Sequence, residues 1–264
     1  MAAENALAIV IRTVPFGETS AVLTLFTREF GKLRCLAKGA WRPKGSFDAA
    51  LDLLSTCQVL VLRKSAGGLD LLTEARLESR FRIGTSLLAF HGGMHVADLL
   101  DALTADADPQ PDLFDVAEST LQALSSHDAS PGLRDDQLRA LLVRTELEML
   151  RIVGHAPSLE HCAECLAPIT TPGRIPFGML DGGVLCDRCR AGKRAVVAVS
   201  RPAVETLRTL ACDAAAWRAI AVPDAVHAEI RGLMNTFCAH LVGKRLKLAP
   251  HLAAIPRPRP QRPS

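Results

Sequence analysis

Four of the eight cysteines form two Cys-x-x-Cys pairs, Cys162 with Cys165 and Cys186 with Cys189. Four thiolates spaced in this way can surround one Zn²⁺ ion tetrahedrally at about 2.3 Å. Because four protein ligands leave no coordination position for a reactive water, we expect one structural Zn²⁺ per chain. The alternative is that four buried or redox-active cysteines fall in pairs by chance.

The remaining cysteines carry no such pattern, and they fall in segments expected to be strands or helices. We expect them to be small core residues, and they are Cys35, Cys57, Cys212 and Cys238. No apolar run reaches the roughly 18 residues of a membrane span, and no signal-peptide pattern follows Met1. We therefore expect a cytoplasmic protein with no membrane association and reduced cysteines.

A basic stretch lies between residues 28 and 44, where six Lys or Arg residues accompany one acid, Glu29. Three of the cations fall on alternate positions of an expected strand and would share one face. Such a row can follow a phosphate backbone, and Trp41 could stack on a base. The predicted nucleic-acid-binding residues are Arg28, Lys32, Arg34, Lys38, Trp41, Arg42 and Lys44. The alternatives are an ordinary solvated face for the cations and burial of Trp41.

Charge is unevenly distributed along the chain, although the formal net charge is only +3. Residues 1–82 carry a net charge of +4, residues 83–150 carry −9, residues 151–199 carry +2 and residues 200–264 carry +6. The basic ends favour a polyanion such as nucleic acid, and the acidic middle favours a different partner.

The first 80 residues have the pattern of five short strands separated by turn residues. The expected strands are Leu7 to Val14, Ala21 to Thr27, Lys32 to Lys38, Cys57 to Arg63 and Leu69 to Leu77. Five short strands in a small basic unit are typical of an OB-fold, and other small barrels fit the pattern equally well.

After Arg82 the apolar residues recur with a helical period. We expect helices over about 85–105, over the segment that follows Pro111, over about 135–153, after Ser200 and over 223–242. The Gly92-Gly93 pair in the first of them indicates close packing. From Pro256 the sequence PRPRPQRPS cannot build a core and is expected to be a flexible basic tail.

A long motif begins at Phe16 and reads FGETSAVLTLFTREFGKLRCLAKGAWRPKGSF. Three further motifs follow it, and they read TELEMLRIVGHAPSLEHCAEC, GGVLCDRC and HLVGKRLKL. In content and order these motifs resemble RecO, a family of bacterial recombination mediators. The resemblance covers most of the chain, except residues 104–136 and the proline–arginine tail.

The resemblance implies a DNA repair protein that binds single- and double-stranded DNA, anneals complementary strands and is not an enzyme. RecO-like proteins act with RecR, and in some bacteria with RecF, to load RecA onto strands coated by single-strand-binding protein. These partners imply a place at the nucleoid. An RNA-binding OB and zinc-ribbon protein of translation or ribosome assembly is the alternative function. No phosphate-binding loop, metalloprotease or hydrolase motif indicates catalysis.

The expected fold class is α+β, with an N-terminal five-stranded OB-fold barrel and an all-α helical domain into which a four-cysteine zinc ribbon is inserted. The expected boundaries are 1–82 for the barrel, 83–154 and 200–250 for the two parts of the helical domain, 155–199 for the ribbon and 251–264 for the tail.

A docking site for the acidic tail of single-strand-binding protein needs a basic, partly apolar groove. Residues 83–150 carry a net negative charge, which would repel an acidic tail. We therefore expect the groove near the last helix. Its cations would be Arg231, Lys244, Arg245 and Lys247, with Leu246 or Leu248 holding an apolar residue. The alternative is that Lys244 to Lys247 stabilise the end of that helix or touch DNA.

Overall fold

A computed structural model describes residues 2–42, 47, 50–64, 68–126, 133–171, 173–248, 251 and 252. The chain folds as two compact units. Residues 1–84 and 93–126 form the first unit, and residues 85–92 and 127–264 form the second. The first unit therefore extends beyond residue 82, the expected end of the barrel domain.

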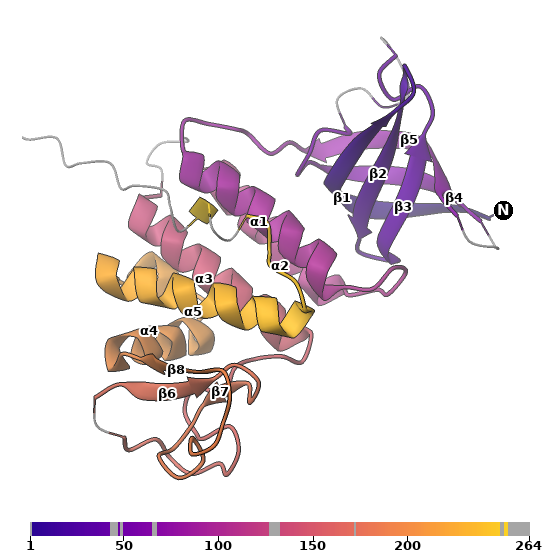
Figure 1. Ribbon diagram of the computed structural model, residues 1–264. Helices are drawn as coiled ribbons and strands as arrows, with labels where there is room; N and C mark the ends of the chain where they lie inside the picture. Colours follow the sequence, from indigo (N-terminus) through magenta and orange to yellow (C-terminus); the bar gives the residue numbers. More distant parts are fainter. Residues whose placement is uncertain are drawn as a thin grey trace, which may run out of the picture. The chain divides into compact units, whose positions relative to one another are not determined.

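The barrel of the first unit is built from five strands, as predicted (Figure 1). They are β1 (Ala2–Phe16), β2 (Ser20–Thr27), β3 (Gly31–Ala37), β4 (Thr56–Arg63) and β5 (Asp70–Ser79). The sheet closes in the order β1-β2-β3-β5-β4, with β4 pairing back onto β1. This closed five-stranded barrel confirms the predicted OB-fold.

Alternate side chains of each strand fill the barrel. Leu33, Cys35 and Ala37 of β3 are buried in the core, as their spacing predicts. Burial raises the pKa of the Cys35 and Cys57 thiols to about 12, so both are inert core residues. Cys238 is also buried, whereas the prediction of a core position is wrong for Cys212, which is exposed.

Among the described residues, two helices contribute to the first unit. They are the C-terminal part of α1 (Leu87–Leu103) and all of α2 (Pro111–Ser125). The rings of Phe26 on β2 and Phe114 on α2 stack with centroids 6.3 Å apart. A Cβ atom on Gly93 would lie 2.8 Å from a methyl group of Leu54, which confirms close packing at this glycine.

The connector between α1 and α2 covers the edge of β3. The backbone N–H of Ala107 donates to the carbonyl of Lys32 at 2.9 Å. Gly31 has φ 68°, and a Cβ atom there would lie 2.0 Å from the carbonyl oxygen of Asp108. Only glycine fits this position without a shift of the backbone. The edge of β3 is therefore protected from pairing with another strand.

The second unit contains α3 (Asp135–Ile152), α4 (Arg201–Cys212), α5 (Asp224–Val242) and a short 3₁₀ helix at Ala216–Arg218 that the sequence did not predict. The Ser200 hydroxyl accepts a hydrogen bond from the N–H of Ala203, so Ser200 is the N-cap of α4, as predicted. Gly243 has a left-handed conformation and ends α5.

A three-stranded antiparallel ribbon follows α3. Its strands are β6 (Ile175–Gly178), β7 (Gly183–Val184) and β8 (Val196–Val199), in the order β7-β6-β8. Phe177 of β6 packs its ring edge-on against Phe237 of α5, with centroids 5.5 Å apart. Within the described ranges, none of the helices combines the length and apolar character that crossing a membrane requires.

Candidate metal centre and nucleic-acid interface

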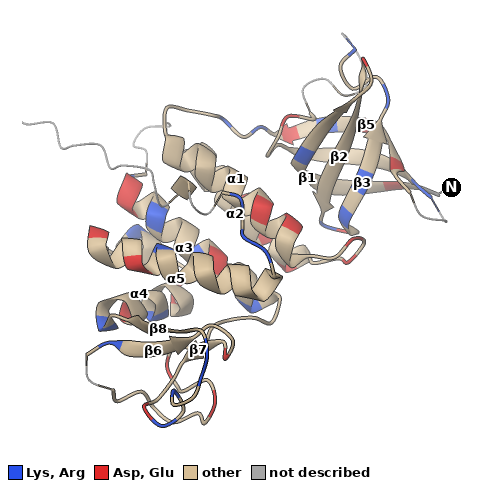
Figure 2. Ribbon diagram, viewed as in Figure 1, with Lys and Arg blue, Asp and Glu red and all other residues tan. Residues whose placement is uncertain are grey.

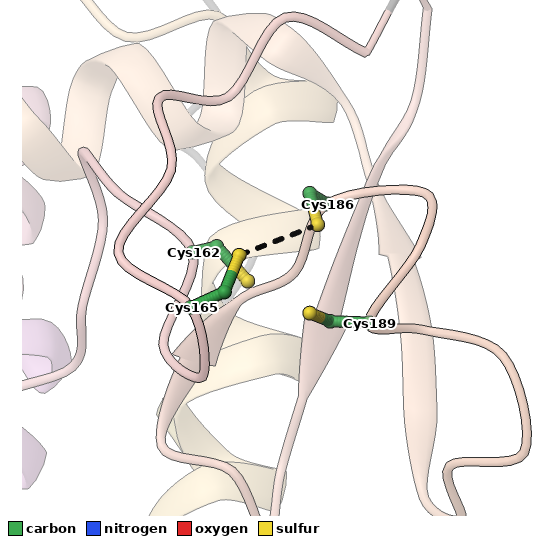
Figure 3. Close-up of side chains that lie close together, drawn as sticks. All are labelled: Cys162, Cys165, Cys186 and Cys189. Carbon is green, nitrogen blue, oxygen red and sulfur yellow. Dashed lines mark hydrogen bonds between the residues drawn. The ribbon is translucent and has the colours of Figure 1, made fainter.

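The four predicted ligand cysteines lie together at one end of the ribbon (Figure 3). Their Sγ atoms are all within 4.8 Å of one another, and those of Cys165 and Cys186 are 3.7 Å apart. Sulfur atoms around a tetrahedral ion with bonds of about 2.3 Å are roughly 3.8 Å apart. The cluster therefore fits one tetrahedrally bound metal ion.

Backbone hydrogen bonds hold each Cys-x-x-Cys pair in a tight turn. The N–H of Leu166 donates to the carbonyl of Cys162 at 2.9 Å, and the N–H of Arg190 donates to the carbonyl of Cys186 at 3.0 Å. A bond from Ala163 N–H to the carbonyl of Val184, at 2.8 Å, joins the first turn to β7. The two pairs face each other because the short ribbon fixes both turns.

The thiols of the cluster have unequal proton affinities. Burial raises the pKa of Cys162, but backbone N–H groups, chiefly that of Cys165, outweigh it and lower the pKa to about 6. The N–H of Cys189 lowers the pKa of Cys186, whereas hydrogen bonds with Cys165 and Cys186 raise the pKa of Cys189. Four thiolates this close repel one another, so their joint ionisation requires a bound cation.

Part of the outer face of β2 and β3 is covered by the helices of the same unit and by the segment between them. Lys32 is only 5% exposed, and its Nζ donates to the carbonyls of Asp101 and Thr104 at 2.8 Å. The prediction that Lys32 contacts phosphate is therefore wrong. Sequence spacing placed Lys32 on the outer face, but α1 and the segment after it bury that position.

Arg28 forms a bidentate ion pair with Asp115 of α2, at 2.8 and 3.0 Å. Hydrogen bonds from Arg28 lower the pKa of Asp115 below its usual range. Arg34 lies 3.5 Å from the carboxylate of Asp106 and remains exposed. The acids of residues 93–126 thus pair with the barrel, which sequence reasoning did not foresee.

The chain that follows β3 carries exposed side chains. Lys38 and Arg42 are exposed and make no ion pair within the part of the chain that the structure describes. Trp41 is 48% exposed, so the alternative that it is buried against the barrel is wrong. The backbone N–H of Trp41 donates to the carbonyl of Thr19, which holds the loop after β3 beside the turn between β1 and β2. Lys44 lies outside the described residues.

Strand register adds three residues that sequence reasoning missed. Arg12 pairs with Thr24, which pairs with Arg34 in the next strand. Val14 and Phe16 follow on the same side of β1 and are exposed, Phe16 by 58%. We call the following group the barrel patch: Arg12, Val14, Phe16, Lys38, Trp41 and Arg42. Figure 2 colours the basic positions along β1 and β3 blue.

A groove of about 510 Å³ lies at the end of α5. It is lined by Asn235, Thr236, Ala239, His240, Gly243, Lys244, Arg245 and Leu246. Lys244, Arg245 and Lys247 are exposed, as a docking role requires. Leu246 is buried and Leu248 half-buried, so Leu248 is the more accessible of the two predicted apolar contacts.

Arg231 is not part of this groove. Its side chain is 3% exposed and forms a bidentate ion pair with the buried Glu146, at 2.9 and 2.7 Å. The prediction that Arg231 binds a partner's carboxylate is wrong, because a carboxylate of the same unit already occupies its guanidinium group.

Known protein families match both the N-terminal and the C-terminal part of the chain. The family model for "Recombination protein O N terminal" matches residues 1–81, and the model for "Recombination protein O C terminal" matches residues 85–249. A "DNA repair protein RecO" of Rhodopirellula baltica is 33% identical, over 93% of this chain and 97% of its own length. A "DNA repair protein RecO" of Myxococcus xanthus is 30% identical, over 94% and 96%.

Proposed function

The chain belongs to the RecO family of DNA repair proteins, and we propose that it binds single- and double-stranded DNA, anneals complementary strands and helps to load RecA onto strands coated by single-strand-binding protein. The proposed role is binding, not catalysis. The observation that carries the proposal is the barrel patch, which holds three exposed cations and two exposed aromatic rings.

The chemistry of the barrel patch suits a strand of any sequence. Arg12, Lys38 and Arg42 can neutralise successive phosphates, and Phe16 and Trp41 can stack on bases, each of which has a π face. Neither interaction reads the base edge. Sequence-independent binding of this kind is what annealing requires.

We propose that the ion of the cysteine cluster is Zn²⁺, one per chain, with a structural role. An all-thiolate tetrahedral site favours Zn²⁺ over harder cations, and four protein ligands close the site to substrate. The cluster would hold the two turns of the ribbon and, through Phe177, its packing on α5.

The groove at the end of α5 is proposed to bind the acidic tail of single-strand-binding protein, since it combines two exposed cations with apolar lining. Further proposed partners are a RecR-like protein and, in some bacteria, a RecF-like protein. With these partners the protein would act at the nucleoid, in the cytoplasm. RNA is the alternative ligand, because the barrel patch does not distinguish the two backbones.

Replacing Lys38 or Arg42 by alanine should lower the slope of log K against log salt by about 0.7 on single strands, because each phosphate contact releases condensed counterions. The loss should be similar on different sequences. Fluorescence anisotropy with labelled oligonucleotides measures the binding constant at each salt concentration. Competition with matched DNA and RNA oligonucleotides shows which of the two ligands binds more tightly.

The matched control is Arg76→Ala, because Arg76 lies on β5 outside the barrel patch and pairs with Glu78. Its slope should equal that of the unaltered protein. Unchanged slopes in Arg12→Ala, Lys38→Ala and Arg42→Ala would move the binding face elsewhere on the molecule. Stronger competition by RNA would favour the alternative function.

Replacing Lys244 and Arg245 together by alanine should weaken binding of the acidic tail peptide roughly tenfold, since exposed ion pairs contribute up to about 1 kcal/mol each. Isothermal titration calorimetry with the isolated peptide measures the affinity. The control, Arg134→Ala with Arg151→Ala, removes two charges from the same unit and should bind normally. Equal affinities for both double variants would contradict docking in the groove.

A further inference from the structure

The second cysteine turn and the turn that follows it, residues 186–194, carry three exposed arginines, and we infer that they form a second phosphate-binding site for a nucleic-acid strand. They are Arg188, Arg190 and Arg194. The site belongs to the second unit and shares no residue with the barrel patch. The inference rests on the proposed annealing function and deepens it.

Most other cations of the ribbon and its surroundings have a structural partner. Arg208 donates to the carbonyl of Leu159 at 2.8 Å, and Arg201 donates to that of Thr171 at 2.7 Å. Arg174 pairs with Glu229. By contrast, no ion pair or side-chain hydrogen bond involves Arg188, Arg190 or Arg194 within the described ranges.

The lysine between these arginines also has structural partners, unlike the arginines themselves. Lys193 lies between Arg190 and Arg194, and its Nζ pairs with Glu164 at 3.0 Å and with Asp181 at 2.8 Å. These two carboxylates raise the pKa of Lys193. The nearby acids are therefore engaged with the lysine, and the three arginines keep their charge unneutralised.

The turn that bears the arginines is held in shape. The N–H of Arg190 donates to the carbonyl of Cys186, and the N–H of Lys193 donates to the carbonyl of Arg190 at 3.2 Å. Gly192 has φ 74° and allows the chain to reverse there. The ion pairs of Lys193 tie this turn to the first cysteine turn. Binding would consequently order the arginine side chains but not the backbone.

A phosphate backbone is the ligand that this turn fits. Guanidinium groups bind phosphate oxygens with two parallel hydrogen bonds, and they carry their charge at every physiological pH. Only one acid, Asp187, lies between Cys186 and Arg194, and it accepts a hydrogen bond from the Thr171 hydroxyl. Annealing needs two strands to be held at once, and the barrel patch accounts for one.

The test is a bridging experiment with the full-length, metal-loaded protein. One oligo(dT) strand is immobilised, protein is bound to it, and capture of a second, labelled oligo(dT) strand is measured across a salt series. Because both strands are oligo(dT), base pairing contributes nothing. We expect the R188Q, R190Q, R194Q variant to bind the immobilised strand normally and to capture at least tenfold less of the second strand.

Loss of three phosphate contacts should also lower the salt slope of capture by about 2. A variant with lysine at all three positions should retain capture, because phosphate contacts require charge. The control variant R134Q, R151Q, R218Q removes three charges from the same unit and should capture normally. Unchanged melting temperature and metal content show that each variant is folded.

Capture by the three-glutamine variant equal to that of the unaltered protein would overturn the inference while leaving single-strand binding intact. Equal losses in the control variant would overturn it as well, since the effect would then be one of net charge. If the unaltered protein failed to bind even the immobilised strand, the proposed function would fail and the inference with it.

Discussion

Replacing Arg231 by methionine should lower the free energy of unfolding by about 3 to 5 kcal/mol. The side chains of Arg231 and Glu146 are 3% and 1% exposed, and two hydrogen bonds join them. Without the guanidinium group, the Glu146 carboxylate would lose its cation in a buried site, where ionisation is costly. Urea unfolding followed by circular dichroism measures the change.

The double variant Arg231→Met with Glu146→Leu separates this cost from simple loss of packing. Replacing a buried ion pair by apolar residues of similar size is often neutral, so the double variant should recover most of the lost stability. A single Arg231 variant as stable as the original, or a double variant no better than the single one, would contradict the account. Peptide binding at the α5 groove should be normal in the double variant.

Replacing Cys162 and Cys186 by serine should abolish metal binding and unfold the ribbon. Structural zinc in small modules contributes about 10 kcal/mol or more of apparent binding free energy, which exceeds what a ribbon of this size gains from packing. Elemental analysis should find one zinc per chain before the change and none after it. Hydrogen exchange should then be fast over residues 155–199.

The barrel should keep its protection from exchange, because its core belongs to the other compact unit. Cys212→Ser is the matched control, since Cys212 is exposed and lies outside the cluster, and it should retain one zinc. A purified protein without zinc would refute the metal assignment. Zinc retained by the Cys162 and Cys186 double variant would refute the ligand assignment.

Much of the fold followed from local patterns. The five strands were predicted because each has a short apolar run and turn residues at its ends, and the bounds agree to within a few residues for β2 to β5. The prediction for β1 was too short at both ends, because it ran from Leu7 to Val14 whereas β1 spans Ala2–Phe16. The cysteine cluster was predicted because a metal site of this type needs only the four cysteines and their spacing.

Which residues form the barrel patch depended on information that local patterns do not contain. A register shift between Val10 and Arg12 changes which residues of β1 face outward. The residue types at these positions do not predict that shift. Alternation of Arg12, Val14 and Phe16 before the turn was the available signal.

The pairing of cations could not be predicted either, because their partners are distant in sequence. Arg28 meets Asp115, and Arg231 meets Glu146, across 87 and 85 residues. A basic stretch identifies candidate ligands for phosphate, but only the packing of helices decides which cations remain exposed. The same packing explains why residues 93–126 can be acidic beside a basic barrel.

Annealing of complementary oligonucleotides coated by single-strand-binding protein tests the central claim most directly. The unaltered protein should accelerate annealing, and the variant Phe16→Ala, Lys38→Ala, Trp41→Ala should lose that acceleration, since stacking contributes about 1 to 3 kcal/mol per base. Arg76→Ala should anneal normally. No acceleration by the unaltered protein, or full acceleration by the folded triple variant, would contradict annealing through the barrel patch.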